Sequence, residues 1–485
     1  MVQLRNNNNT SNIPRLFFDK GTICIKNSKL IRIPRTKFDE NDNETLRAFG
    51  LDYKEISEYM KTSELDFVDQ VANYLHSPVF EINNLLELRD YQKNAIDKWI
   101  ASSMCGCVVL PTGAGKTAVG IKAIEKINAA TLVVVPTIDL MDQWAENLSK
   151  YFTKNKKEND QKDTQQHVGC LGGGRENIQA ITVATYDSAY LRASYIGNQF
   201  KLVIFDEVHH LPAPGYRSIA EQMIAPYRLG LTATIEREDG LHEQIPRLVG
   251  GIVFQMGPNE LSESKHLAKF EIERRQVNLT AEEQRDYAEN YSLFTSSLAK
   301  LGLKVLSMHN LRRLIMMSNK NKIAREGLLA RNKANEIALN SKSKIVELEK
   351  ILEENYGAKT IIFTQNNKMV YGISDKFLIP LITYKTTKDE RHDVLDGFRT
   401  GRYNAVVTSR VLDEGIDVPD AELGIIMSGT GSGRELIQRL GRLLRPKQDG
   451  KKARLIEIVS RQTRETNTSA KRITSLRKNT GTKTI

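Results

Sequence analysis

The chain has 485 residues, the length of about three domains of ~150 residues, so it can bury large cores without disulfides or structural metals. It has 70 Lys and Arg against 59 Asp and Glu, and this net charge of +11 favours an anionic partner, most commonly nucleic acid. It has only four cysteines, and no apolar run approaches the ~18–20 residues that span a bilayer. These features exclude a disulfide scaffold and an integral membrane protein, and we expect a cytoplasmic protein with no membrane partner.

Residues 1–85 predict a small α+β module. Short β-prone runs within 16–34, separated by Gly21, are typical of a hairpin or meander. Apolar residues such as Ile56 and Met60 then recur at helical spacing, and we expect residues 45–85 to be helical.

From residue 86 short apolar runs alternate with helix-forming segments, a pattern that indicates βαβ units around a parallel sheet. We assign 86–250 to this first α/β domain. Residues 251–345 are basic and are expected to be helical, and a second series of strands and helices follows over 346–460. Residues 461–485 are a basic tail. The predicted fold class is therefore α/β, with two parallel-sheet domains, a helical element between them and a small N-terminal module.

The run LPTGAGKT at 110–117 follows an apolar run and opens a helix, as a phosphate-binding loop does. Gly113 and Gly115 let backbone N–H groups converge on phosphate oxygens at a helix N-terminus. Lys116 can reach the β- and γ-phosphates of ATP, and the Thr117 hydroxyl can ligate Mg²⁺. The predicted ATP-binding residues of this loop are Thr112, Gly113, Ala114, Gly115, Lys116 and Thr117.

A second apolar run ends in FDEVHH at 205–210. Adjacent carboxylates at the end of an apolar strand are costly unless they have partners or a function. Asp206 can hold Mg²⁺ directly or through water, and Glu207 can act as the general base for an attacking water. For His209 a hydrogen-bonding role is favoured over metal ligation, because no third ligand is evident.

The phosphate loop and DEVHH together resemble the DExH helicases of superfamily two, over roughly 88–450. The resemblance implies two RecA-like motor domains that close on ATP. It implies that Gln92 recognises adenine and that Asp417 faces the nucleotide. The residues implied to contact nucleic acid in this pattern are Pro136, Thr137, Thr185 and Thr408, and those implied to couple hydrolysis to the cleft are His209, Thr232 and Thr234.

The run QRLGRLLRP at 438–446 matches the arginine-finger motif of the same superfamily. On a helix, residues spaced by one, three and three positions group loosely on one face. Guanidinium groups opposite a γ-phosphate stabilise the transition state when the two domains close. The implied residues are Gln438 and Arg439 for coupling and Arg442 and Arg445 for catalysis.

Within that superfamily the details resemble the XPB (xeroderma pigmentosum group B) class. The acidic box continues as DEVHHLPAP, and Arg237, Glu238 and Asp239 form an Arg-Glu-Asp triplet that the class ties to DNA opening. The class also has a thumb-like helical insertion, matched by the basic segment after 250, and a damage-recognition-like module, which 1–85 would match.

The resemblance implies an ATP- and Mg²⁺-dependent DNA helicase or translocase of 3'-5' type, acting in repair or transcription on single-stranded or forked duplex DNA. A nuclease or a transcription or repair factor is a possible partner. Two alternatives stay open. The chain could be a DNA-stimulated ATPase scaffold that recruits a nuclease with little unwinding, or it could be an RNA helicase.

Overall fold

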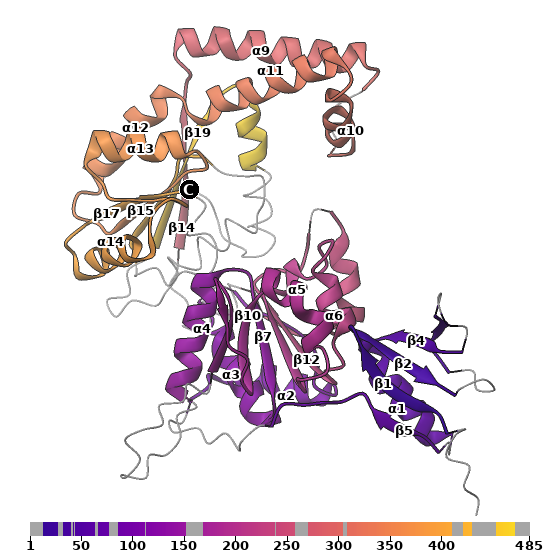
Figure 1. Ribbon diagram of the computed structural model, residues 1–485. Coiled ribbons are helices and arrows are strands. Elements are labelled where there is room, and N and C mark those ends of the chain that lie inside the picture. The colour runs from indigo at the N-terminus through magenta and orange to yellow at the C-terminus, as the bar shows by residue number, and fades with distance from the viewer. Residues whose placement is uncertain are drawn as a thin grey trace, which may run out of the picture. The chain divides into compact units, whose positions relative to one another are not determined.

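The computed structural model (Figure 1) describes residues 13–27, 33–39, 42, 44–63, 66–76, 86–111, 113–151, 168–237, 239–257, 270–303, 308–409, 421–428 and 453–470. The chain divides into two compact units, Met1–Met256 and Gly257–Ile485. Among the helices of the described residues, none has both the length and the apolar character needed to cross a membrane.

The N-terminal module is a sheet in the order β3-β4-β2-β1-β5 with one helix packed on it. Its strands are β1 (Arg15–Asp19), β2 (Thr22–Lys26), β3 (Lys37–Phe38), β4 (Leu46–Phe49) and β5 (Val68–Gln70). The expected hairpin is present, because β1 pairs antiparallel with β2. The 3₁₀ turn η2 (Gly50–Asp52) leads into α1 (Tyr53–Thr62), whose Ile56 and Met60 are buried against the sheet.

In the described part of 45–85 the expected helix is confined to η2 and α1; β4 and β5 are strands, and 71–76 is neither helix nor strand. β4 pairs antiparallel with β2, and β5 pairs parallel with β1. In β4 Leu46 and Ala48 are buried and Phe49 is exposed, a two-residue alternation that suits a strand. β4 has only four residues, too few for this alternation to be distinguished from the helical spacing of apolar residues in the neighbouring α1. Residues 77–85 lie outside the described residues.

The first α/β domain contains an eight-stranded sheet in the order β13-β6-β12-β11-β7-β10-β8-β9, parallel throughout except for the pair β8 and β9. The strands are β6 (Cys105–Val109), β7 (Thr131–Val135), β8 (Val168–Gly172), β9 (Arg175–Glu176), β10 (Ile181–Thr185), β11 (Leu202–Asp206), β12 (Tyr227–Thr232) and β13 (Ile252–Gln255). The helices and 3₁₀ turns are α2 (Asp90–Ala101), α3 (Lys116–Ile127), α4 (Ile138–Tyr151), α5 (Tyr186–Ile196), η3 (Val208–His210), α6 (Arg217–Gln222), η4 (Leu241–Gln244) and α7 (Ile245–Leu248).

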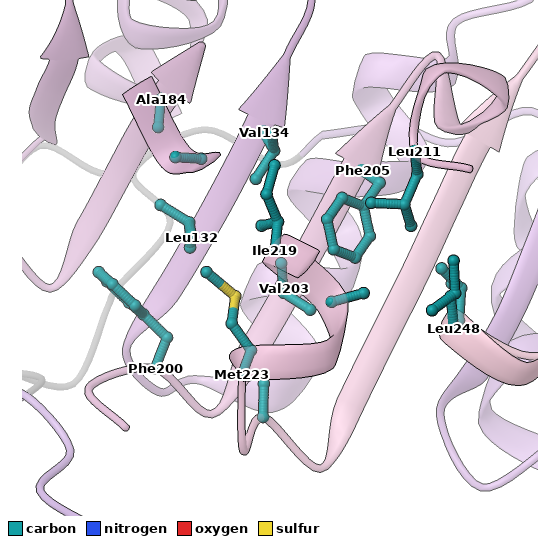
Figure 2. Close-up of a cluster of buried hydrophobic side chains, with 14 of the residues drawn as sticks. Leu132, Val134, Ala184, Phe200, Val203, Phe205, Leu211, Ile219, Met223 and Leu248 are labelled. Atoms are coloured by element: carbon teal, nitrogen blue, oxygen red, sulfur yellow. The ribbon is translucent and has the colours of Figure 1, made fainter. Parts of the chain in front are cut away.

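The core of this domain explains why its strands are continuous apolar runs. Every residue of β7, β10 and β11 is buried, since helices cover both faces of a parallel sheet. Figure 2 shows Leu132 and Phe205 of the sheet clustered with Ile219, Met223 and Leu248 from the region of α6 and α7.

The second α/β domain is a six-stranded, wholly parallel sheet in the order β14-β19-β18-β15-β17-β16. Its strands are β14 (Phe270–Val277), β15 (Thr360–Phe363), β16 (Leu381–Ile382), β17 (Ala405–Thr408), β18 (Leu423–Ile426) and β19 (Ala453–Ser460). Its helices are α12 (Lys342–Glu354), α13 (Asn367–Phe377) and α14 (Lys388–Thr400). Three more helices precede them, α9 (Ala281–Lys300), α10 (Met308–Ser318) and α11 (Lys322–Leu339).

Helices α9 and α11 lie along each other in the segment that the sequence analysis expected to be helical (Figure 1). A Cβ added at Gly327 of α11 would lie only 2.6 Å from the Cβ of Ser297 in α9, so the two backbones approach closely there. Helix does not fill 251–345, however. β13 pairs with β6, and β14 pairs with β19 over eight residues. Both strands pair with strands that are distant in sequence, so local composition did not reveal them.

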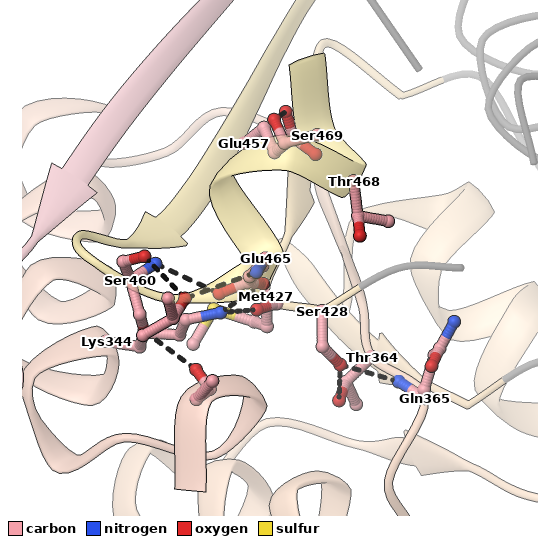
Figure 3. A network of polar contacts seen from close by, with 12 residues as sticks. Lys344, Thr364, Gln365, Met427, Ser428, Glu457, Ser460, Glu465, Thr468 and Ser469 are labelled. Carbon is pink, nitrogen blue, oxygen red and sulfur yellow. Dashed lines mark hydrogen bonds and ion pairs between the residues drawn. The ribbon is translucent and has the colours of Figure 1, made fainter. Parts of the chain in front are cut away.

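A buried ion pair fastens the end of the second sheet (Figure 3). The Lys344 ammonium donates to Glu465 Oε1 at 2.7 Å and to the Met427 carbonyl at 2.7 Å. Glu465 Oε2 accepts the Ser460 N–H at 2.9 Å. Residues 461–470 of the expected basic tail are therefore tied to this domain, and 471–485 lie outside the described residues.

The N-terminal module is joined to the first α/β domain by backbone hydrogen bonds. Asn73 N donates to Asn198 O at 3.0 Å, and Leu75 N donates to Gln199 O at 2.9 Å. Nearby, the two backbones almost touch, because a Cβ on Gly50 would lie 2.5 Å from the carbonyl oxygen of Gln222.

Gly50→Ala should therefore destabilise the first unit by about 1–3 kcal/mol, the usual cost of overpacking against backbone. Both tryptophans of the chain, Trp99 and Trp144, lie in that unit, so their fluorescence reports its unfolding. The matched control is Gly372→Ala in α13, where an added Cβ meets nothing within 4 Å. Denaturant titration should move the tryptophan midpoint in the first variant only. An unchanged midpoint in Gly50→Ala would contradict the close contact.

Candidate active site

The predicted motifs of the first domain gather at one edge of its sheet, because parallel strands all end at the same edge. Thr232 pairs with Val109 at the end of β6, and Thr185 pairs with Val135 at the end of β7. Asp206 ends β11, which lies between β12 and β7. The predicted nucleotide-binding motifs follow β6, β12 and β11, and the predicted nucleic-acid motifs follow β7 and β10. Since neighbouring strands are ~4.8 Å apart, the two sets of motifs lie next to each other at this edge.

The phosphate loop has the left-handed turns that its glycines predict. Gly113 has φ +82° and Gly115 has φ +76°, and Gly115 is the N-cap of α3. Lys116 begins the helix, and its ammonium donates to the Leu110 carbonyl at 3.4 Å. The same ammonium lies 3.7 Å from Glu207 Oε1, and both side chains are only partly exposed. The loop lysine and the predicted general base thus meet at one point.

Gln92 connects α2 to this loop. Its Oε1 accepts the Arg89 N–H at 2.9 Å, and its Nε2 donates to the Ala114 carbonyl at 2.9 Å and to that of Gly115 at 3.4 Å. The Tyr91 hydroxyl donates to the same Ala114 carbonyl at 2.9 Å. The carboxamide implied to recognise adenine therefore also fixes the position of the phosphate loop.

Asp206 is a buried carboxylate held by donors from two directions. Trp144 Nε1 of α4 donates to Oδ2 at 2.7 Å, and the Glu207 N–H donates to Oδ1 at 3.0 Å. Burial, followed by the nearby Glu207 charge, raises the pKa of Asp206 to about 6, while Lys116 opposes the shift. A cation bound here would relieve this concentration of negative charge. Thr117, the other predicted Mg²⁺ ligand, is the second residue of α3 and is partly buried.

The hydroxyl of Thr232 lies at the centre of a hydrogen-bond cluster. It is 2.9 Å from His209 Nδ1 and 3.3 Å from Glu207 Oε2, and it donates to the Thr234 carbonyl at 2.8 Å. One hydroxyl carries one hydrogen, so it can donate either to Thr234 or to Glu207 at any moment. Thr232, one of the residues implied to couple hydrolysis to movement, is therefore in direct contact with the predicted general base.

Arg237 extends this cluster to the Arg-Glu-Asp triplet. Its guanidinium donates to the His209 carbonyl at 2.6 Å and binds both oxygens of Asp239, at 2.9 and 2.7 Å. The hydrogen bonds from Arg237 hold the pKa of Asp239 well below its usual range. The middle member of the triplet, Glu238, lies outside the described residues.

The nucleic-acid motifs of the first domain stand at helix starts. Pro136 and Thr137 follow β7, and Thr137 Oγ1 accepts the Leu140 N–H at 3.2 Å. Thr185 is the N-cap of α5, where its Oγ1 accepts the Ser188 N–H at 3.2 Å. Backbone N–H groups at such helix starts are donors suited to phosphate oxygens.

In the second domain Thr408, implied to contact nucleic acid, ends β17, and its side chain is buried and donates to the Ser409 carbonyl at 2.9 Å. The other predicted residues of that domain and one loop residue lie outside the described residues: Thr112, Asp417, Gln438, Arg439, Arg442 and Arg445. Their assignments stay predictions.

Trp144 and Tyr186 both donate hydrogen bonds to Asp206, and neither was among the site residues predicted from the sequence. Each lies beside a motif that was identified, but a contact across 62 or 20 residues leaves no local pattern. The sequence offered one indication of their role: each is a large amphipathic side chain close to a predicted site residue.

Two family models match the chain: "Type III restriction enzyme, res subunit" over residues 85–237 and "Helicase conserved C-terminal domain" over 343–447. A protein of Sulfurisphaera tokodaii named DNA 3'-5' translocase XPB2 is 45% identical over 425 residues, which cover 88% of this chain and 93% of that protein. This chain belongs to the XPB family.

Another XPB family member, the DNA 3'-5' helicase XPB of Kineococcus radiotolerans, is 31% identical over 400 residues. The match covers 79% of this chain and 62% of that protein, so the chain spans less than two thirds of that relative. The Hef helicase domain of Pyrococcus furiosus aligns with a TM-score of 0.52 at 19% identity, covering 81% of this chain and 99% of that one. The likeness confirms the predicted fold, with two RecA-like domains.

The raised pKa of Asp206 gives a prediction for the protein in EDTA without nucleotide. Trp144 donates to this carboxylate, so its fluorescence should titrate with a midpoint near pH 6. Because the folded-state pKa lies above the ordinary aspartate value of about 4, the folded state binds the extra proton, and this group's contribution to stability falls as pH rises from about 4 to 6. Trp99→Phe should keep the titration and Trp144→Phe should abolish it. A midpoint below pH 4.5 in Trp99→Phe would contradict the assignment.

Proposed function

We propose that the chain is an ATP-dependent DNA translocase and helicase of 3'-5' type that acts in repair or transcription. One observation carries the proposal: the phosphate loop, Asp206 and Glu207 adjoin Thr137 and Thr185 at one sheet edge. Membership of the XPB family supports DNA as the nucleic acid. A repair or transcription factor, or a nuclease, is the proposed partner.

The residues around Asp206 fit a magnesium ion bound together with ATP. Mg²⁺ prefers oxygen ligands and commonly takes only one or two from protein, with phosphates and water supplying the rest. Thr117 and Asp206 offer one hydroxyl and one carboxylate. When bound, the ion would neutralise charge on the β- and γ-phosphates.

In the proposed reaction Lys116 binds the β- and γ-phosphates, and Glu207 accepts a proton from the attacking water. The 3.7 Å contact between the two side chains supports this arrangement, because the ammonium can move from the carboxylate to a phosphate. Glu207 has a left-handed backbone, with φ +48°, which turns its side chain out of the β11 direction. Arg442 and Arg445 are proposed to complete the site from the second domain.

DNA is proposed to bind through its backbone without base readout. The helix starts at Thr137 and Thr185 offer N–H donors to phosphates, and these contacts carry no sequence information. The excess of basic residues would make the affinity fall as salt rises.

Three variants test the motor assignment. Glu207→Gln should lower the kcat of DNA-stimulated ATP hydrolysis about 10²–10⁴-fold, the usual contribution of a general base. Arg442→Ala should lower it about 10³–10⁵-fold, as for an arginine finger. Lys116→Ala should also weaken ATP binding, whereas Lys126→Ala, exposed on the same helix, is the matched control. Wild-type turnover in any of the three would remove that residue's role.

The same assay separates the alternatives. It should be run with duplex DNA, single-stranded DNA and RNA, and with a forked duplex for strand separation. Stimulation by RNA above that by DNA would favour the RNA helicase. DNA stimulation without strand separation would favour the scaffold.

The Thr232 cluster predicts how hydrolysis responds to DNA. Thr232→Val removes the hydroxyl that contacts both Glu207 and His209, so the ratio of kcat with saturating DNA to kcat without DNA should fall about fivefold or more. Thr232→Ser keeps the hydroxyl and should restore the ratio. Equal ratios in the two variants would show that the hydroxyl does not set the response to DNA.

A further inference from the structure

Helix α4 connects a nucleic-acid motif to the buried carboxylate. It starts directly after Thr137, which accepts the Leu140 N–H, and two turns later it presents Trp144. The indole of Trp144 is fully buried, and its Nε1 donates to Asp206 Oδ2 at 2.7 Å. Because a helix of this length moves as a rigid rod, a shift at its start displaces the indole N–H as well.

Helix α5 makes the same connection from the next strand. Thr185 caps it, and Tyr186, its first residue, is almost fully buried. The Tyr186 hydroxyl donates to the backbone carbonyl of Asp206 at 3.2 Å. This carbonyl stands where β11 ends and the backbone turns into the left-handed conformation of Glu207. The hydrogen bond therefore holds the turn that orients the predicted general base.

Helix α3, which follows the phosphate loop, packs against the indole of Trp144. A Cβ added at Gly120 of α3 would lie 2.5 Å from Cη2 of Trp144 and 3.3 Å from Cδ1 of Leu231. The indole is thus enclosed between α3 and the sheet, with no room to swing away from Asp206. It can change position only together with α3 or α4.

We propose that Trp144 and Tyr186 are positioning residues that transmit nucleic-acid contact at the starts of α4 and α5 to Asp206, and so to the bound Mg²⁺ and the general base. This inference rests on the proposed function. Neither residue touches ATP or DNA in the proposal. Each acts through Asp206, one on the side-chain oxygen and the other on the backbone carbonyl.

The test measures binding, because a coupling free energy between two ligands is reciprocal. The Kd for a fluorescent single-stranded DNA is measured by anisotropy with and without Mg²⁺ and a non-hydrolysable ATP analogue. The ratio of the two Kd values is the coupling factor, which we expect to be about fivefold or more in the wild type. Tyr186→Phe and Trp144→Phe should each bring it closer to one by about twofold or more, the equivalent of one lost hydrogen bond.

Matched controls separate coupling from packing. Trp99→Phe makes the same change at another buried indole, whose Nε1 donates to the Arg228 carbonyl at 2.9 Å, and it should keep the coupling factor. Tyr186→Phe removes a single oxygen and so tests the inference even if Trp144→Phe folds poorly. Gly120→Ala keeps both donors but displaces the indole, and it should lower the factor too.

The possible results distinguish failure of this inference from failure of the proposed function. A wild-type coupling factor in Tyr186→Phe and Gly120→Ala, or an equal loss in Trp99→Phe, would overturn the inference. A wild type that hydrolyses ATP on DNA but shows no coupling would also overturn it and leave the motor assignment standing. A wild type whose ATP hydrolysis ignores DNA would instead remove the proposed function itself.

A spectroscopic readout gives a second, independent check. In Trp99→Phe the indole of Trp144 is the only tryptophan, and DNA added without nucleotide should change its emission, because α4 moves it relative to Asp206. An unchanged emission at saturating DNA would mean that contact at the helix start does not reach the carboxylate.

Discussion

The first α/β domain depends on one constraint, the need to keep a charged carboxylate at the end of a buried strand. Asp206 is 5% exposed, and an unpaired charge at such a depth would cost several kcal/mol. The domain meets this cost with an indole N–H, a backbone N–H and a nearby ammonium. The two donors and the ammonium come from α4, from the strand end and from the phosphate-loop helix, so satisfying the carboxylate also brings the three motifs together.

The two α/β domains treat charge at their carboxyl edges differently. In the first domain Lys116 and Glu207 are 3.7 Å apart and keep 11% and 14% of their side chains exposed, so a ligand can still reach them. In the second domain Lys344 and Glu465 are 2.7 Å apart, with 0% and 3% exposed, and further hydrogen bonds satisfy both groups. The second pair has no capacity left for a ligand and fastens residues 461–470 to the sheet. Two similar sheets thus each carry a charge pair at this edge. The pair in the first domain is accessible to a ligand, and the pair in the second domain is buried and structural.

The sequence predicted the strands and turns that are specified by residues close together in the chain. The apolar runs that became β7 and β11 are buried on both faces, and Gly113 and Gly115 adopt the positive φ angles that their motif requires. Prediction failed where the decisive partner is distant. β5, which pairs with β1, has only three residues, and β14, which pairs with β19, has apolar side chains at only three of its eight positions. Trp144 was missed for the same reason, since nothing near residue 144 reveals a carboxylate at 206.

A small shift of α4 is enough to break the hydrogen bond through which Trp144 would connect the start of that helix to Asp206. The hydrogen bond from Trp144 to Asp206 is 2.7 Å long, and hydrogen bonds weaken steeply once donor and acceptor separate beyond about 3.5 Å. A displacement of α4 by about 1 Å would therefore exchange a strong charge-assisted bond for none, at a carboxylate that is only 5% exposed. The backbone of Glu207 is already in a region that non-glycine residues rarely adopt, at φ +48°, and it is held there by its neighbours. In the proposed coupling, a small displacement of α4 or α5 would therefore change the partners of Asp206 and the orientation of Glu207 together.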